Sequence, residues 1–290
     1  RLHISPPAVT RAVTSLEARL GVRLLNRTTR SLSMTEAGVR FLETARTVLA
    51  DIEAAEKAAL GEMAAPQGRL TVTTSFTFGR TALAPIVSEF LGAHPQVRLS
   101  VLLIDRTVNL VEEGIDVAVR IGPLSDSSLI ARRVGEVRRL LVASPKYLDR
   151  RGWPRNPSDL KLHSIIAFTG LVANRKWGYL DRGGVAYQSF EPRLEINDAA
   201  TAIAAATAGD GLTVALSYMV AEQLRSGALV PVLEAVTPPP VPVHLVYPHN
   251  RLVAPKVRAF IDFAAPKLSR RLRELAIDPL GETPGAEAPG

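Results

Sequence analysis

The first regular pattern in the chain is an amphipathic helix near its start. Apolar side chains recur at spacings of four, three and four residues, which places on one helix face Val9, Val13, Leu16 and Leu20. Ser5-Pro6-Pro7 is typical of a helix start, and Gly21 ends the helix. The opposite face carries hydroxyl and guanidinium groups, on Thr10, Arg11, Thr14, Ser15 and Arg19. Such a face fits the DNA major groove, although the periodicity alone equally suits any amphipathic surface helix.

Two short β-prone runs follow within residues 22–34, separated by a polar turn rich in arginine and threonine. They predict a two-stranded hairpin with Arg27 and Arg30 near its tip. A basic hairpin beside a helix with a polar face would clamp the backbone of duplex DNA.

A long helix is predicted from Thr35, as its cap, to about Ala64. Its apolar positions keep a period of 3.5 residues, at Phe41, Ala45, Val48, Ile52, Ala55 and Ala59. This period is typical of a helix that pairs with a copy of itself, and the alternative is a long helix packed within its own domain. Residues 65–68 then break the pattern, and we expect the domain boundary there.

From Arg69 onward, short apolar runs alternate with helical stretches. We expect strands at 70–74, 97–104, 117–121, 140–143, 164–168, 193–196, 212–215, 229–233 and 243–246. We expect helices at 79–93, 108–114, 198–208, 218–225 and 256–272, and one that begins at Ser144-Pro145. This alternation predicts an α/β fold with mostly parallel sheets in two successive units. Residues 273–290, rich in Gly, Pro, Ala and Glu, are expected to be disordered.

Charge is concentrated at the start of the chain. The 290 residues, enough for about two domains, hold 35 Lys and Arg against 28 Asp and Glu, a net charge of +7. Within residues 1–35, six arginines accompany a single acid, Glu17. Arginine suits phosphate and guanine contacts, and the alternative is an ordinary solvated basic face.

The absence of cysteine excludes disulfides and cysteine-ligated zinc, and it fits a reducing cytosol. No uncharged apolar run reaches the roughly 18–20 residues of a membrane span. The chain opens Arg-Leu-His-Ile-Ser, with neither an initiator Met nor an apolar signal core, so we expect a fragment of a longer protein, located in the cytoplasm.

Catalytic and metal-binding patterns are missing from the sequence. There is no phosphate-binding loop, and the five histidines do not pair at helical spacing. The Ser158-to-Lys161 spacing resembles an acyl-enzyme pattern, but after Pro157 it indicates a capped helical turn. We therefore expect no catalytic residues, no metal and no cofactor.

Three linked blocks carry a family resemblance: residues 5–11, 16–28 and 35–38. They resemble the DNA-binding signature of the LysR-type transcriptional regulators. The rest, to about residue 272, resembles that family's effector domain, which is similar to type 2 periplasmic binding proteins, and the markers lie at 68–72, 95–97, 113–122, 197–198, 209–212 and 260–263. Members normally carry about two dozen further residues first, so this chain holds only the end of the helix-turn-helix.

The resemblance implies a role for each part of the first 65 residues. Residues 1–34 would be a partial winged helix-turn-helix, and 35–65 the dimerising linker helix. Positions that match DNA contacts in relatives are Pro7, Thr10, Arg11, Thr14, Arg27 and Arg30.

The effector domain, 66–272, would form two lobes: 69–143 with 248–272, and 144–247. The expected crossovers lie near Ser144 and Tyr247. Ligands in such sheets bind at the carboxyl ends of strands, which points to Thr74, Ser75, Phe76, Phe78, Thr107, Arg120, Gly122, Phe168, Asn197 and Asp198. The resemblance implies an organic acid or an aromatic as effector, because family members mostly sense small organic acids, amino acids or aromatics, and hydroxyls and helix starts would suit a carboxylate. Alternatively, Ser75 and Asn197 only cap helices, and Arg120 forms a structural ion pair.

The favoured interpretation is a regulator that binds double-stranded operator DNA, responds to a small effector and works as a homodimer or homotetramer, with RNA polymerase as a candidate partner. A solute-binding protein that shares the cleft fold is the main alternative, and an α/β enzyme is the third.

Overall fold

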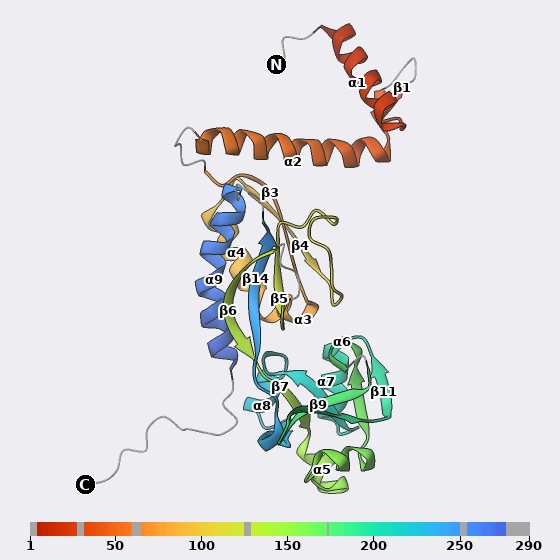
Figure 1. The fold of residues 1–290 in the computed structure, drawn as a ribbon, viewed down its shortest axis with the longest axis vertical. Helices are drawn as coiled ribbons and strands as arrows, with labels where there is room; N and C mark the ends of the chain where they lie inside the picture. Colours follow the sequence, from red (N-terminus) through yellow and green to blue (C-terminus); the bar gives the residue numbers. More distant parts are fainter. Residues whose placement is uncertain are drawn as a thin grey trace, which may run out of the picture. The chain divides into compact units, whose positions relative to one another are not determined.

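The computed structural model describes residues 5–27, 32–59, 65–124, 129–172, 174–249 and 254–276. The chain divides into an N-terminal unit, Arg1–Gly68, and a C-terminal unit, Arg69–Gly290. The N-terminal unit contains α1 (Pro6–Leu20), β1 (Leu25–Arg27), β2 (Leu32–Met34) and α2 (Glu36–Ala59) (Figure 1). β1 and β2 pair antiparallel, with Leu25 opposite Met34, so the predicted hairpin forms. Arg30 and residues 60–64 lie outside the described residues.

Side chains of this unit fix α1, the hairpin and α2 to one another. Glu17 Oε1 in α1 accepts hydrogen bonds from the backbone N–H groups of Leu24 (2.8 Å) and Leu25 (3.0 Å). Thr35 caps α2 as predicted, because its Oγ1 accepts from the Gly38 N–H at 2.9 Å. The same hydroxyl donates to the Arg23 carbonyl oxygen at 2.7 Å. Glu17, the only acidic residue within residues 1–35, therefore holds α1 to the hairpin.

The first lobe of the C-terminal unit is a five-stranded sheet in the order β4-β3-β5-β14-β6. Its strands are β3 (Gly68–Thr74), β4 (Val97–Leu103), β5 (Val117–Ile121), β6 (Leu129–Val137) and β14 (Val241–Pro248). β3 and β5 are parallel, whereas β14 runs antiparallel to β5 and β6. Its helical elements are α3 (Phe76–Phe78), the π-helical turn η1 (Gly79–Leu83), α4 (Ala84–Ala93) and α9 (Pro255–Leu275). α9 packs against β6 and α4 (Figure 1).

The second lobe is a five-stranded sheet in the order β11-β8-β12-β7-β13. Its strands are β7 (Arg139–Ala143), β8 (Ile165–Phe168), β11 (Pro192–Ile196), β12 (Leu212–Leu216) and β13 (Val230–Val232). β8 is parallel to β11 and β12, whereas β7 is antiparallel to β12 and β13. The helical elements are α5 (Pro145–Arg151), η2 (Pro157–Leu162), α6 (Thr169–Val172), α7 (Ala199–Ala208), η3 (Ser217–Met219), α8 (Ala221–Arg225) and η4 (Glu234–Val236). A separate hairpin pairs β9 (Lys176–Asp181) with β10 (Gly184–Ser189).

Alternation along the strands of the second lobe builds two cores. Leu141 packs with Tyr147 and Trp177 on one face of the sheet, whereas its neighbour Leu140 packs with the helices α7 and α8 on the other. The sheet is thus buried on both faces, which explains why β7 and β12 are nearly continuous apolar runs.

Strand membership corrects the predicted lobe boundaries. β7 lies in the sheet of the second lobe and β14 in the sheet of the first, so the crossovers do not lie near Ser144 and Tyr247. The first crossover is at Arg138, between β6 and β7, and the second lies between β13 and β14. The first lobe therefore comprises 69–137 and 241–276, and the second 139–240. The start signal at Ser144-Pro145 marks α5, which begins one strand after the chain has changed lobes.

Further differences from the sequence expectations have local causes. The sheets are mixed rather than mostly parallel, because β7 and β14 return antiparallel between other strands. Within the expected helix 108–114, residues 110–114 form turns, because Gly114 adopts a left-handed conformation (φ 63°) and ends the segment after about one turn. α9 extends to Leu275, past the expected end at 272, because Leu275 is buried in the core of the first lobe. Residues 277–290 lie outside the described residues.

Candidate functional site

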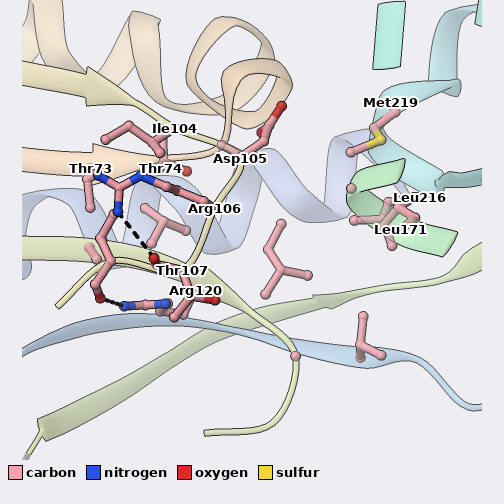
Figure 2. Close-up of a pocket in the computed structure, with 18 of the residues that line it drawn as sticks. Thr73, Thr74, Ile104, Asp105, Arg106, Thr107, Arg120, Leu171, Leu216 and Met219 are labelled. Atoms are coloured by element: carbon pink, nitrogen blue, oxygen red, sulfur yellow. Dashed lines mark hydrogen bonds between the residues drawn. The ribbon is translucent and has the colours of Figure 1, made fainter. Parts of the chain in front are cut away.

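A cavity of about 320 Å³ lies between the two lobes of the C-terminal unit. From the first lobe it is lined by the ends of β3 and β5 and by residues 104–108, and from the second by the segments that follow β8 and β12. Figure 2 shows Arg106, Thr107 and Arg120 on one side of this space and Leu171, Leu216 and Met219 on the other. These three first-lobe side chains are polar and these three second-lobe side chains are apolar, although the second lobe also contributes Arg139 to the wall.

Six of the ten residues predicted to bind an effector line this cavity. They are Thr74, Ser75, Thr107, Arg120, Gly122 and Phe168. All six lie at or just beyond the carboxyl end of a strand or in the connection that follows one, which is the reason for their prediction. That they bind an effector stays a prediction.

The other four predicted residues do not line the cavity. Phe76 is 51% exposed, and Phe78 is fully buried in the core of the first lobe. Asn197 is exposed beside Asp198, which caps α7: the Asp198 carboxylate accepts from the Thr201 N–H (2.8 Å) and the Thr201 hydroxyl (2.6 Å). These hydrogen bonds hold the pKa of Asp198 below its usual value. The helix-capping alternative therefore describes this position, with Asp198 rather than Asn197 as the cap.

Ser75 does not act as a cap. It precedes α3, but its hydroxyl makes no capping hydrogen bond. Its Oγ lies 3.5 Å from the hydroxyl of Tyr218, which comes from η3 in the second lobe. Burial raises the pKa of Tyr218 strongly, so its phenol stays protonated at every physiological pH. Ser75 therefore lines the cavity and also contacts Tyr218 of the other lobe.

Guanidinium groups dominate the charges on the cavity wall, which carries Arg106, Arg120 and Arg139 with one acid, Asp105. Arg106 is neutralised by two hydrogen bonds to the Glu113 carboxylate, at 2.9 and 3.0 Å, which lower the pKa of Glu113. The interaction recorded for Arg120 is a hydrogen bond of 2.5 Å from its Nη2 to the Val108 carbonyl oxygen (Figure 2). Arg120 therefore does not form the alternative structural ion pair with any described residue.

Several wall residues were missed in the sequence. Ile104, Asp105 and Arg106 follow β4. Leu216 ends β12, and Tyr218 and Met219 come directly after it, so the strand-end rule that identified Thr74 could have found all of them. Arg139 begins a strand instead of ending one. No local signal marks it, because it reaches the cavity only through the pairing of β7 with β12.

The described residues contain neither a cluster suited to a metal ion nor a helix suited to a membrane. No group of three or more His, Asp or Glu residues there could hold a metal ion. No described helix is long and apolar enough to cross a membrane.

The predicted DNA-reading residues of α1 are exposed. Pro7, Thr10, Arg11 and Thr14 all lie on the accessible surface of the N-terminal unit. Arg27 is at the end of β1, in the hairpin. In α2, two positions of the predicted stripe, Val48 and Ile52, are about half exposed, and Leu49, next to the stripe, is 63% exposed. DNA contact and pairing through this stripe stay predictions.

Comparisons with known proteins identify the family of both parts of the chain. The model of the LysR substrate binding domain matches residues 64–269, and that of bacterial regulatory helix-turn-helix proteins of the lysR family matches residues 1–39. An HTH-type transcriptional regulator of Xanthomonas campestris pv. campestris is 35% identical over 272 residues, which cover 92% of this chain and 79% of that protein. The regulator CrgA of Neisseria meningitidis serogroup B is 33% identical over 273 residues, 94% of this chain and 91% of that protein.

Solved structures show the same two-part organisation. A structure of CrgA from Neisseria meningitidis aligns with a TM-score of 0.64 at 33% identity, and covers 92% of this chain and 91% of that one. The full-length virulence activator AphB of Vibrio cholerae aligns with a TM-score of 0.63 at 30% identity, and covers 91% of this chain and 90% of that one. The chain therefore belongs to the LysR family of transcriptional regulators, with a helix-turn-helix DNA-binding segment followed by a substrate-binding effector domain.

Proposed function

We propose that a small molecule bound in the cavity between the lobes sets the affinity of this regulator for its operator. The observation that carries the proposal is the cavity itself, because its wall is shared by both lobes. A ligand that contacts both lobes binds one lobe arrangement better than another, and so shifts the population between them. In an oligomer, that shift would change the spacing of the DNA-binding segments.

The proposal includes the partners expected from the sequence. Thr10, Arg11 and Thr14 of α1 would read the major groove, and Arg27 and Arg30 would contact the backbone beside it. Homodimers or homotetramers would form through the uncovered stripe of α2. The protein would act in the cytoplasm, with an organic acid or an aromatic compound as effector and RNA polymerase as a further partner.

The DNA arm of the proposal is tested by gel shift of the full-length protein on its own upstream region. We expect a complex whose affinity falls steeply as salt rises, since phosphate contacts release counterions. Arg11→Ala should weaken binding and reduce the salt slope by about one unit. Arg182→Ala, which removes the same charge from the exposed end of the β9–β10 hairpin, is the matched control. Equal affinities for both variants would remove the assignment of Arg11.

The effector arm is tested by filling the cavity. Met219→Trp adds bulk to the wall at a flexible side chain, so it should leave operator affinity intact and abolish its response to added organic acids, amino acids or aromatic compounds. Leu162→Trp adds the same ring at a position that is 80% exposed, and it should respond like the wild type. A Met219→Trp variant that still responds fully would place the effector elsewhere.

A further inference from the structure

We infer that Arg139, at the start of β7, selects an anionic ligand for the cavity and transmits its binding to the first crossover. This inference rests on the proposed function, because it assigns a specificity-determining residue to the same cavity. Neither the helix-start signals nor the strand-end rule points to Arg139. It is placed by pairing, opposite Leu216 of β12, on the cavity wall.

The charge balance of the wall favours an anion. Arg106 is neutralised by Glu113, which lies outside the wall. The remaining charged groups are Arg120 and Arg139 against Asp105, so one positive charge has no counterpart on the wall. A ligand with a single carboxylate would balance it, whereas a neutral or cationic ligand would leave it unbalanced in a partly dehydrated space.

Of Arg120 and Arg139, Arg139 has the clearer unmet hydrogen-bonding capacity. Its Nε is buried and has no acceptor among the described residues. Thr74 Oγ1, also on the wall, is buried and without a described partner. A buried N–H without an acceptor destabilises the protein. A small movement of the Arg139 side chain that opens this N–H to the cavity would let a carboxylate oxygen accept the hydrogen bond, with the added attraction of opposite charge. Arg120, in contrast, already donates to the Val108 carbonyl oxygen.

The second lobe also supplies an apolar surface for the rest of the ligand. Leu171, Leu216 and Met219 are its apolar side chains on the wall (Figure 2). A carboxylate at Arg139 with a hydrocarbon or aromatic body against these side chains satisfies both chemistries of the wall. The geometry favours small ligands, because a volume of about 320 Å³ is at the low end of ligand pockets, which span roughly 300–1,000 Å³.

Arg139 is also covalently next to the point where the chain changes lobes. The Arg138 N–H donates to Ser217 Oγ at 3.1 Å, and the Ser217 N–H donates to the Arg138 carbonyl oxygen at 2.8 Å. Ser217 begins η3, the segment that carries Tyr218 into the first lobe. An anion bonded to Arg139 therefore acts within one residue of the joint between the lobes.

The test measures direct binding to the full-length protein by isothermal titration calorimetry, with matched pairs of a carboxylate and its neutral amide. The pairs are benzoate and benzamide, phenylacetate and phenylacetamide, and hexanoate and hexanamide. We expect at least one carboxylate to bind, and to bind at least about tenfold tighter than its amide, the strength of one charged hydrogen bond. Carboxylates that fail to bind, or amides that bind equally well, would overturn the inference.

Variants assign the effect to the residue. Arg139→Gln should weaken carboxylate binding by about 10- to 100-fold and leave amide binding unchanged. Arg139→Lys, which keeps the charge, should retain the preference for carboxylates, and Arg182→Gln should behave as wild type. An Arg139→Gln variant that keeps the preference, or an Arg139→Lys variant that loses it to the same extent, would contradict the assignment. Circular dichroism spectra that match the wild type establish that each variant is folded.

The inference and the proposed function fail in different ways. If carboxylates bind through Arg139 but leave operator affinity unchanged, the selectivity of the cavity stands and its control of DNA binding falls. If a neutral compound binds in the cavity and changes operator affinity, the control stands and the role of Arg139 falls.

Discussion

Tyr218 packs edge-on against Phe78, with ring centroids 5.3 Å apart and ring planes at 77°. Phe78 belongs to α3 of the first lobe, whereas Tyr218 follows β12 of the second lobe, and both side chains are buried in the core of the first lobe. One lobe thus completes the core of the other, and Tyr218 also lines the cavity beside Ser75.

The Phe78 ring should make a large contribution to stability. Phe78→Ala is expected to lower the free energy of unfolding by about 3–5 kcal/mol, because it leaves a cavity where the two lobes meet. Phe76→Ala, two residues earlier and half exposed, should change it by less than about 0.5 kcal/mol. Urea titrations of the full chain measure both. Comparable losses for the two variants would mean that the contact between the lobes is not a tight one.

Asp198 is expected to act as a helix cap and not as a ligand group. Asp198→Ala should destabilise the protein by about 1 kcal/mol, since the Thr201 N–H loses its acceptor. Asn197→Ala should be near neutral because Asn197 is exposed and accepts no capping bond in α7. Neither change should alter ligand affinity by calorimetry. A selective loss of ligand binding in Asp198→Ala would restore the sequence-based assignment.

Acidification should weaken the second lobe through His163. The Tyr147 hydroxyl accepts from the Ser164 N–H at 2.8 Å and lies within hydrogen-bonding distance, 3.2 Å, of His163 Nδ1. Burial lowers the pKa of His163, an effect that nearby Asp159 opposes and Arg151 reinforces. As pH falls, the unfolded chain therefore takes up this proton first, near its ordinary pKa of 6.5.

The resulting stability is fully present above pH 6.5 and is lost as pH falls through the lowered pKa of the folded state. Urea titrations from pH 7.5 to about pH 5 should show this loss, and His163→Gln should make the dependence shallower. Part of the pH dependence will remain in the variant, because burial also lowers the pKa of His244. An identical pH profile for wild type and variant would exclude His163 as its source.

Gly38 is required by the close approach of α2 to the hairpin. A Cβ at this position would lie 2.0 Å from the Leu24 carbonyl oxygen, so Gly38→Ala should destabilise the N-terminal unit despite the higher helix propensity of alanine. Gly92→Ala makes the same change in α4 with no atom within 4 Å of the new Cβ. It should stabilise by up to about 1 kcal/mol. Thermal melting followed by circular dichroism should thus show opposite signs, and two stabilised variants would disprove the close approach.

The elements that sequence reasoning located correctly are those specified by neighbouring residues. Ser144 and Pro145 mark the start of α5, and Thr35 marks the start of α2, because capping depends on residues within one turn. β6 escaped prediction because Arg132 and Arg133 interrupt its apolar pattern and face solvent. The lobe assignment of β7 also escaped, since it depends on pairing with β12, about seventy residues later.

The residues of the candidate site show the same difference between local signals and long-range pairing. Thr74, Ser75 and Arg120 were found because they lie at the ends of strands, a position visible in the sequence. Asp198 satisfied the same rule, yet its carboxylate is used by the backbone of its own helix. Arg139 reaches the cavity only because β7 pairs with β12, which no local pattern encodes.

The discontinuity of the first lobe dictates an order of assembly on the ribosome. β14 lies between β5 and β6, and α9 completes the same core, but both are synthesised after the whole second lobe. The second lobe is nearly continuous and is free to fold while translation proceeds, whereas the first must wait for its last strand and helix. Termination of translation before residue 241 would thus leave β5 without its antiparallel neighbour. The unpaired edge of the sheet would be prone to aggregation, which makes such a chain a substrate for chaperones and proteases.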